Sequence, residues 1–364
     1  MKKVYSYTIV LSAFILCCFV SIWVYFLFTP AVTQDEGYVY YVRPGITKRL
    51  VVNELAQQGI ITHPVLLLIY GFPQKNAALK TGEYRFAKGS TPYSIWKQIT
   101  TGTGLLYHPF AIIPGWTFKQ LRAELLKAQG LRHVTAALSD NQIMERLGYA
   151  NLSPEGEFFP DTYYYTRGNS DLSILKRASH LMQVKLQAAW DKRSAGLPYQ
   201  NPYEALIAAS MIEKEGYLDS ERPIIAGVLM NRLRKNMLLQ IDATVIFGLG
   251  DRYDGKIYKQ NLLEDTPYNT YLHKGLPPTP IAMPGLSSLS AATMPQQNDF
   301  YYYVAKGDGS HQFSTNLQAH NEAVKTNKQN KQNETVNNTP VREQIESSIG
   351  SQLTTPSNPL LMTH

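Results

Sequence analysis

The hydrophobic and polar positions of the chain begin with a long apolar run, which predicts a membrane-spanning helix. Residues 8–28 contain no charged side chain, and Lys2 and Lys3 precede them. About 20 residues at 1.5 Å per residue cross the roughly 30 Å hydrocarbon core of a bilayer. This run is longer than the apolar part of a signal peptide and lacks a small-residue cleavage site after it. The lysines favour a cytoplasmic N-terminus, residues 1–7, and place the chain from about residue 30 onward outside the cytoplasm.

Residues 39–128 carry three diverged copies of a strand–turn–helix unit. Each copy has an apolar strand, then a glycine with threonine or serine close behind, then a helix with apolar residues on one face. The copies begin at Val39, Tyr84 and Phe110. The module resembles LysM-like carbohydrate-binding folds. Two interpretations remain open: a glycan-binding LysM-like subdomain, or an α+β spacer in which these residues supply only turn and N-cap chemistry.

Residues 203–250 contain two helical patterns around a short turn. The first pattern is densely apolar over residues 206–212 and is followed by Glu213, Glu215 and Gly216. A glycine in this place predicts a helix end with the glycine in the left-handed conformation. The turn between two buried helices is a rigid place to hold a carboxylate.

The second pattern predicts a helix with one buried face. Asp219 or Ser220 is expected to cap it, and Pro223 is tolerated in its first turn. Three apolar residues recur at four-residue spacing on the buried face: Ile225, Leu229 and Leu233.

The remaining patterns complete an α+β fold. Residues 151–170 combine prolines and glycines with dense aromatics, which predicts an irregular packed segment. The polar tail at 326–364 has few apolar residues and is expected to be disordered. The domain prediction is a transmembrane anchor at 8–28, a LysM-like α/β subdomain at 39–128 and a mixed α+β catalytic domain at 129–325. Further helices are expected at 139–148, 170–195 and 287–293, and a strand at 300–306 that turns into a hairpin and a last short helix.

Composition excludes several classes of function. The net charge of +7 comes without a Lys/Arg-dense run, so no nucleic-acid partner is expected. Cys17 and Cys18 are the only cysteines and lie in the apolar run, so no disulfide or cysteine-based metal site is expected elsewhere. The chain has no nucleophile elbow, phosphate-binding loop or zinc-binding His-Glu-x-x-His sequence. We therefore expect no metal and no cofactor, and what remains is carboxylate chemistry.

Glu215 is the leading candidate for that chemistry. Glu213 and Glu215 point about 200° apart on a helix, so they cannot act as a pair. The last helical turn and partial burial both raise the pKa of a carboxyl at Glu215, as a general acid requires. Glu213 lies further inside and is expected to pair with a cation: Arg232, Arg234 or Lys214.

Four segments resemble the MltG/YceG-like endolytic murein transglycosylases. The segments are EGEFFPDTYYY (155–165), ASMIEKEG and its continuation (209–255), DTPYNTYLHKGLPPTPIAMPG (265–285) and YYYVAKGDGSHQFSTNLQAHN (301–321). The resemblance covers roughly residues 40–325, and the apolar anchor before it also fits. The sequence departs from the family pattern at Gly216, Ile241 and Ala243.

The resemblance implies both a reaction and a site. The second glutamate of the family's Glu-Lys-Glu motif is catalytic, and it corresponds to Glu215. The implied enzyme cleaves the MurNAc–GlcNAc bond of nascent peptidoglycan strands, and the C6 hydroxyl of the sugar attacks to leave a 1,6-anhydro end. Glu215 would serve as both acid and base, and the glycan-positioning candidates are Gln240, Asp242, Tyr268 and Asn269.

Two other functions remain open. One is a membrane-anchored scaffold that binds peptidoglycan without cleaving it. The other is a hydrolase with Asp242 as second carboxylate. For the transglycosylase, the anchor and the resemblance together imply a single-pass protein of the cell inner (cytoplasmic) membrane with its catalytic domain on the periplasmic side. Cell-wall synthesis or division proteins are the protein partners expected there.

Overall fold

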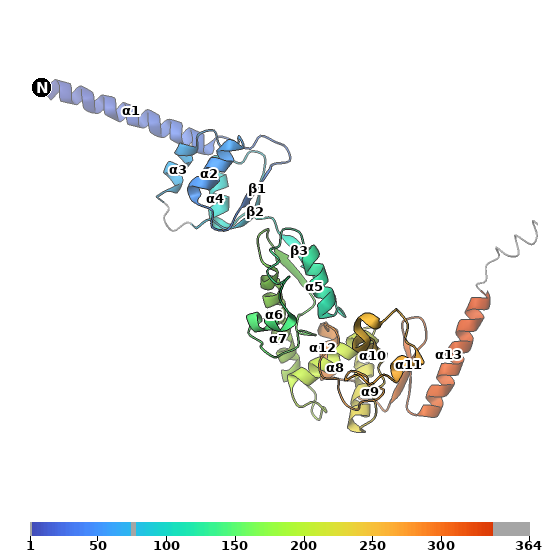
Figure 1. Cartoon of the computed structure of the whole chain (residues 1–364). Coiled ribbons are helices and arrows are strands. Elements are labelled where there is room, and N and C mark those ends of the chain that lie inside the picture. The colour runs from blue at the N-terminus through green and yellow to red at the C-terminus, as the bar shows by residue number, and fades with distance from the viewer. Residues whose placement is uncertain (1, 74–77, 338–364) are drawn as a thin grey trace, which may run out of the picture. The chain divides into compact units, whose positions relative to one another are not determined.

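The computed structural model describes residues 2–73 and 78–337, with α-helices and three short antiparallel strand pairs (Figure 1). It is a mixed α+β chain, which confirms the predicted class. The chain divides into two compact units, Met1–Lys185 and Leu186–His364. Each unit is described by itself.

Helix α1 (Lys2–Phe28) opens the first unit. Its segment Tyr5–Phe28 is long and apolar enough to cross a membrane. In the last turn of α1, Phe26 and Leu27 are buried in the core of the domain that follows the helix.

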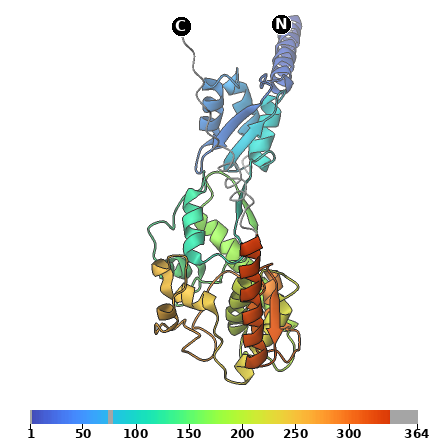
Figure 2. The same ribbon diagram turned by 90° about the vertical axis from the view of Figure 1, so that its right-hand side faces the viewer.

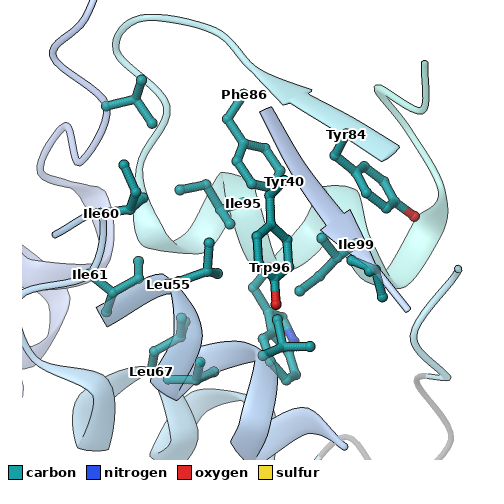
Figure 3. Packing of buried hydrophobic residues seen from close by; sticks show 14 of the residues in the cluster. Tyr40, Leu55, Ile60, Ile61, Leu67, Tyr84, Phe86, Ile95, Trp96 and Ile99 are labelled. Atoms are coloured by element: carbon teal, nitrogen blue, oxygen red, sulfur yellow. The ribbon is translucent and has the colours of Figure 1, made fainter. Parts of the chain in front are cut away.

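That domain packs three helices against a two-stranded sheet. Strand β1 (Tyr38–Val42) pairs antiparallel with β2 (Gly82–Phe86), and Tyr40 lies opposite Tyr84. Helix α2 (Lys48–Gln57) and helix α3 (Pro64–Gly71) follow β1, and α4 (Pro92–Thr101) follows β2. Figure 3 shows the shared core, in which Leu55, Leu67, Tyr84, Ile95 and Trp96 are almost wholly buried.

The third strand–turn–helix copy pairs with a later part of the chain. Strand β3 (His108–Ala111) leads into α5 (Phe118–Lys127), and β3 pairs with β4 (Thr162–Tyr165). This pair joins residues on both sides of the boundary expected at 128/129. It also gives regular structure to part of the segment that the sequence predicted to be irregular. Helices α6 (Asp140–Leu147) and α7 (Asp171–Asp191) lie where the sequence predicted them.

The three copies share one turn geometry. In each copy a glycine with positive φ is followed two positions later by a threonine that caps the helix with its side-chain oxygen. Glycine adopts this left-handed backbone without steric cost, and threonine satisfies a free N–H of the first helical turn. The pairs are Gly45 and Thr47, Gly89 and Thr91, and Gly115 and Thr117.

The second unit is built around helix α8 (Pro202–Glu215), in which every side chain from Ala205 to Ile212 is buried. Helix α12 (Leu286–Thr293) packs against α8 and against α9 (Arg222–Arg234). Strands β5 (Tyr302–Ala305) and β6 (His311–Ser314) form the predicted hairpin, which α13 (Leu317–Asn337) covers (Figure 2). The shorter elements between α9 and α12 are α10 (Asp242–Leu249), η1 (Gly250–Arg252) and α11 (Lys259–Leu262).

Two expectations about the turn after α8 are wrong. Gly216 has φ −87° and is not left-handed. A Cβ at residue 216 would lie 2.6 Å from Cγ of Arg222, so a larger residue there would displace the Arg222 side chain. Neither Asp219 nor Ser220 caps α9: the helix begins after Glu221, which makes no capping hydrogen bond.

The last helix is longer than predicted. Residues 326–337 were expected to be disordered, but α13 continues to Asn337. Lysine, glutamine and glutamate have good intrinsic helix propensity, and this part of α13 contains all three. The rest of the expected tail, 338–364, lies outside the described residues.

Candidate active site

The two glutamates at the end of α8 face different surroundings. Glu213 pairs with Arg222 (3.0 Å) and accepts hydrogen bonds from the Gly285 N–H (2.9 Å) and the Ser288 hydroxyl (2.8 Å). It is 5% exposed and ties α8 to α9 and α12. The expected partner was Arg232, Arg234 or Lys214; the turn after α8 instead brings Arg222 to it. Glu213 is therefore structural, and Glu215 is left to face a cavity.

Glu215 lines an open cavity of about 490 Å³. The walls come from six places in the second unit: the ends of α8 and α9, the segment that leads into α10, the turn that contains Tyr271, the β5–β6 hairpin and the start of α13. Tyr271, Tyr303 and His311 add aromatic and polar surface to this wall. The cavity therefore combines aromatic rings with charged and hydrogen-bonding side chains.

The surroundings of Glu215 favour its neutral form. Burial is the main cause of its raised pKa, and the negative charge of Asp242 raises it further. A hydrogen bond from the Tyr303 hydroxyl to Oε2 of Glu215 (3.1 Å) and the nearby His311 oppose this shift. The pKa of Tyr303 is raised well above its ordinary value by burial and by Glu215, so its hydroxyl remains a donor. The raised pKa expected for Glu215 is thus confirmed.

Asp242 lies on the same cavity wall as Glu215. It is the first residue of α10, whose N-cap is Ile241, so Asp242 is not itself the cap. Its Oδ1 accepts a hydrogen bond from the Tyr271 hydroxyl. Burial and the Asp242 hydrogen bond both raise the pKa of Tyr271 and keep this donor protonated.

Gln240 also lines the cavity, in a conformation unusual for its residue type. Its φ of +53° is left-handed, and its N–H donates to the Thr270 carbonyl (3.1 Å). Its side-chain oxygen accepts from Arg232 (3.3 Å). Arg232 is 8% exposed, and its guanidinium also donates to the Tyr301 and Leu239 carbonyls. Arg232 therefore connects Gln240 to the residue that precedes β5.

Tyr268 and Asn269, the other two glycan-positioning candidates, are not part of this wall. Asn269 is 1% exposed, and its amide donates to the carbonyls of Leu262 (3.1 Å) and Glu264 (2.8 Å). Its oxygen accepts from the N–H of Tyr271 (2.9 Å), so Asn269 shapes the turn that delivers Tyr271 to Asp242. The Tyr268 ring packs edge-on against Phe247, and its hydroxyl bonds to Thr279 (3.0 Å).

Sequence reasoning missed Tyr271, Tyr303 and the pair of His311 with Glu221. Nδ1 of the His311 ring lies 2.8 Å from one carboxylate oxygen of Glu221. The backbone N–H of His311 donates to the other oxygen (3.0 Å). The available signal was the apolar strand pattern at 300–306. It does not say which face of the hairpin meets α8.

Among residues 2–73 and 78–337, no group of three or more His, Cys, Asp or Glu side chains could hold a metal ion.

Comparison with known proteins gives one consistent result. A sequence model of the YceG-like family matches residues 40–326. A protein of Bacillus subtilis (strain 168) named endolytic murein transglycosylase is 32% identical over 242 residues, which is 66% of this chain and 67% of that protein. One of the same name from Streptococcus pneumoniae (strain D39) is 25% identical over 80% of this chain, which spans only 59% of that protein's length.

One solved structure is also similar. A YceG-like protein of Listeria monocytogenes, solved by crystallography, superposes with a TM-score of 0.51 at 26% sequence identity. The match covers 79% of this chain and 99% of the Listeria chain.

Proposed function

Because the chain belongs to the YceG-like family, we propose that it is an endolytic lytic transglycosylase that cleaves the MurNAc–GlcNAc bond of nascent peptidoglycan. Glu215 is the general acid and base of this proposal. The observation that carries it is the carboxyl of Glu215, whose pKa is raised by burial and which lines an open cavity with the Tyr303 hydroxyl donating to its Oε2 atom. The relatives' names support the substrate class.

The proposed reaction needs only one carboxyl group. Glu215 gives its proton to the glycosidic oxygen as the bond from that oxygen to C1 of MurNAc breaks. The C6 hydroxyl of the same MurNAc then bonds to C1 and returns its proton to Glu215. No water is consumed, and the product carries a 1,6-anhydro ring. The Tyr303 hydrogen bond stabilises the carboxylate between the two proton transfers.

Gln240 and Asp242 are proposed to position the glycan, because they line the same cavity. For Tyr268 and Asn269 we propose an indirect role, through the turn that places Tyr271. Asp242 is also the candidate second carboxylate of a hydrolase. A hydrolase would release ends with one additional water, which mass spectrometry distinguishes from anhydro ends.

The decisive experiment is digestion of polymerised, uncrosslinked glycan followed by mass spectrometry of the ends. Glu215→Gln preserves the shape and is expected to lower the rate by at least about 10²-fold. Glu145→Gln makes the same change at an exposed carboxyl on α6 and is the matched control. Anhydro ends released by the Glu215→Gln protein at the parental rate would sink the assignment. Glycan pull-down without any new ends from the parental chain would favour the scaffold.

Residues 39–128 are proposed to bind glycan as a LysM-like module. The repeated strand–turn–helix units in this segment support the proposal. We also propose that α1 anchors the chain in the cytoplasmic membrane, with the chain after Phe28 on the periplasmic side. The apolar segment Tyr5–Phe28 and the preceding Lys2 and Lys3 support this orientation. Protease protection in sealed spheroplasts tests it: residues after Phe28 should be cleaved from outside.

A further inference from the structure

Helix α3 has an exposed face that is apolar throughout. Val65, Ile69 and Phe72 follow at spacings of four and three residues, and they are 65%, 43% and 58% exposed. Residues 64–73 include no charged side chain. Leu67, on the opposite face, is fully buried in the domain core (Figure 3). A soluble domain rarely presents such a stripe to water without a partner.

Helix α3 adjoins the end of α1 (Figure 1). The Trp23 indole N–H donates to the Leu66 carbonyl (3.0 Å), and the Phe26 ring packs edge-on against His63, the N-cap of α3. Phe26 is itself 8% exposed. The two helices therefore share a fixed contact within the first unit.

The length of α1 sets the depth of that contact. At 1.5 Å per residue the helix rises about 27 Å from Tyr5 to Trp23. The hydrocarbon core of a bilayer is roughly 30 Å thick. With Tyr5 at the inner edge of the core, Trp23 and the Leu66 carbonyl bonded to it lie near its outer edge.

We propose that α3 is an interfacial helix whose Val65, Ile69 and Phe72 side chains insert between the headgroups and first acyl carbons of the bilayer that α1 spans. The partner is lipid rather than protein. The inference rests on the proposed anchoring by α1 and not on catalysis by Glu215.

Aromatic side chains around the same contact fit a membrane interface. The Phe28 and Tyr70 rings lie 5.0 Å and 5.6 Å from the Tyr93 ring, and Tyr25 is 72% exposed. Aromatic residues of this kind collect where acyl chains meet headgroups. A single spanning helix can tilt in the bilayer together with the domain attached to it; a second contact through α3 would restrict that tilt.

The test uses the full chain in phosphatidylethanolamine/phosphatidylglycerol vesicles, with one environment-sensitive fluorophore per molecule. Cys17 and Cys18 are replaced by alanine, and the probe is attached at Ile69→Cys or Phe72→Cys. The matched control is Val39→Cys, which is also apolar and is 44% exposed. Val39 lies on β1 beside the buried Tyr40 and so points away from the core.

Probes at residues 69 and 72 should show blue-shifted emission, loss of iodide quenching and quenching by spin-labelled lipid. The probe at residue 39 should remain open to iodide. Iodide quenching at 69 and 72 equal to that at 39 overturns the proposal. A second result would also overturn it: protection of these probes from iodide that increases with protein density, without quenching by spin-labelled lipid. That result would indicate contact with a second copy of the chain.

Failure of this proposal and failure of the enzymatic one are separable. Alkaline carbonate extraction tests α1 insertion without reference to α3. Introducing Glu215→Gln into the labelled chains should abolish glycan cleavage and leave the quenching pattern unchanged.

Discussion

The Tyr303 hydroxyl donates a 3.1 Å hydrogen bond to Oε2 of Glu215 across 88 positions of sequence. The β5–β6 hairpin thereby touches the acid at the end of α8. Burial raises the pKa of Glu215, and this hydrogen bond lowers it. Tyr303 therefore moderates how strongly the acid holds its proton.

Replacement Tyr303→Phe should reduce catalysis and shift its pH dependence. A hydrogen bond to a charged group contributes about 1.5–3 kcal/mol, which corresponds to a roughly 10- to 100-fold lower rate. Without the donor the pKa of Glu215 rises further, so the alkaline limb of kcat/KM should move to higher pH. The measurement is anhydro-end formation across pH. Tyr301→Phe, whose ring does not line the cavity, is the control; an unmoved alkaline limb in Tyr303→Phe would contradict the proposed role.

Glu213 should matter for stability rather than for chemistry. Glu213→Ala leaves the guanidinium of Arg222, 13% exposed, without this partner, and frees the Gly285 N–H and the Ser288 hydroxyl. Breaking a buried pair on one side costs about 3–5 kcal/mol. Denaturant unfolding should show this loss, whereas Glu145→Gln should change stability by less than about 0.5 kcal/mol. A Glu213→Ala chain as stable as the parent would disprove the structural role.

The local sequence pattern was enough to place Glu215 at the end of a buried helix. The apolar run before Glu213 predicted α8, and the glycine after Glu215 marked its end at the correct residue. The Gly-x-Thr turns predicted three helix starts in the first unit, because the capping interaction spans only three residues. These features depend on neighbours in sequence.

The neighbours of the acid could not be predicted in this way. Tyr303, His311 and Tyr271 reach the cavity through tertiary packing. The local sequence pattern does not reveal which face of the hairpin packs against α8. The same limit explains Asn269, whose family motif suggested substrate contact while its amide is engaged by backbone carbonyls.

The glycine at 216 makes a steric prediction. Its φ of −87° suits any residue, but a Cβ would lie 2.6 Å from Cγ of Arg222. Arg222 also donates to the Gly216 carbonyl (3.0 Å) and pairs with Glu213. Gly216→Ala should therefore displace Arg222 and cost about 1–3 kcal/mol, as overpacking does. Thermal unfolding checks this.

Gly255→Ala is the contrasting control, because the φ of +100° at Gly255 strains alanine although the space around that residue is open. If Gly216→Ala acts by displacing Arg222, then adding Arg222→Ala should relieve the loss of stability caused by Gly216→Ala. It should not relieve the loss caused by Gly255→Ala.

Glu157 predicts a pH-dependent stability in the first unit. It is 1% exposed, and burial raises its pKa to about 7 against a partly opposing hydrogen bond from Gln183. A carboxyl whose folded pKa exceeds its unfolded value binds its proton more tightly in the folded state. Buried Glu157 therefore destabilises the folded chain least below about pH 4.5, where its carboxyl is protonated in both states. The free energy of unfolding falls as the pH rises toward 7. Glu157→Gln should remove this loss and stabilise the chain above pH 7 by up to about 3 kcal/mol. Urea unfolding at pH 5 and pH 8 measures it. Equal effects of the substitution at both pH values, as expected for the exposed Glu145→Gln, would refute the prediction.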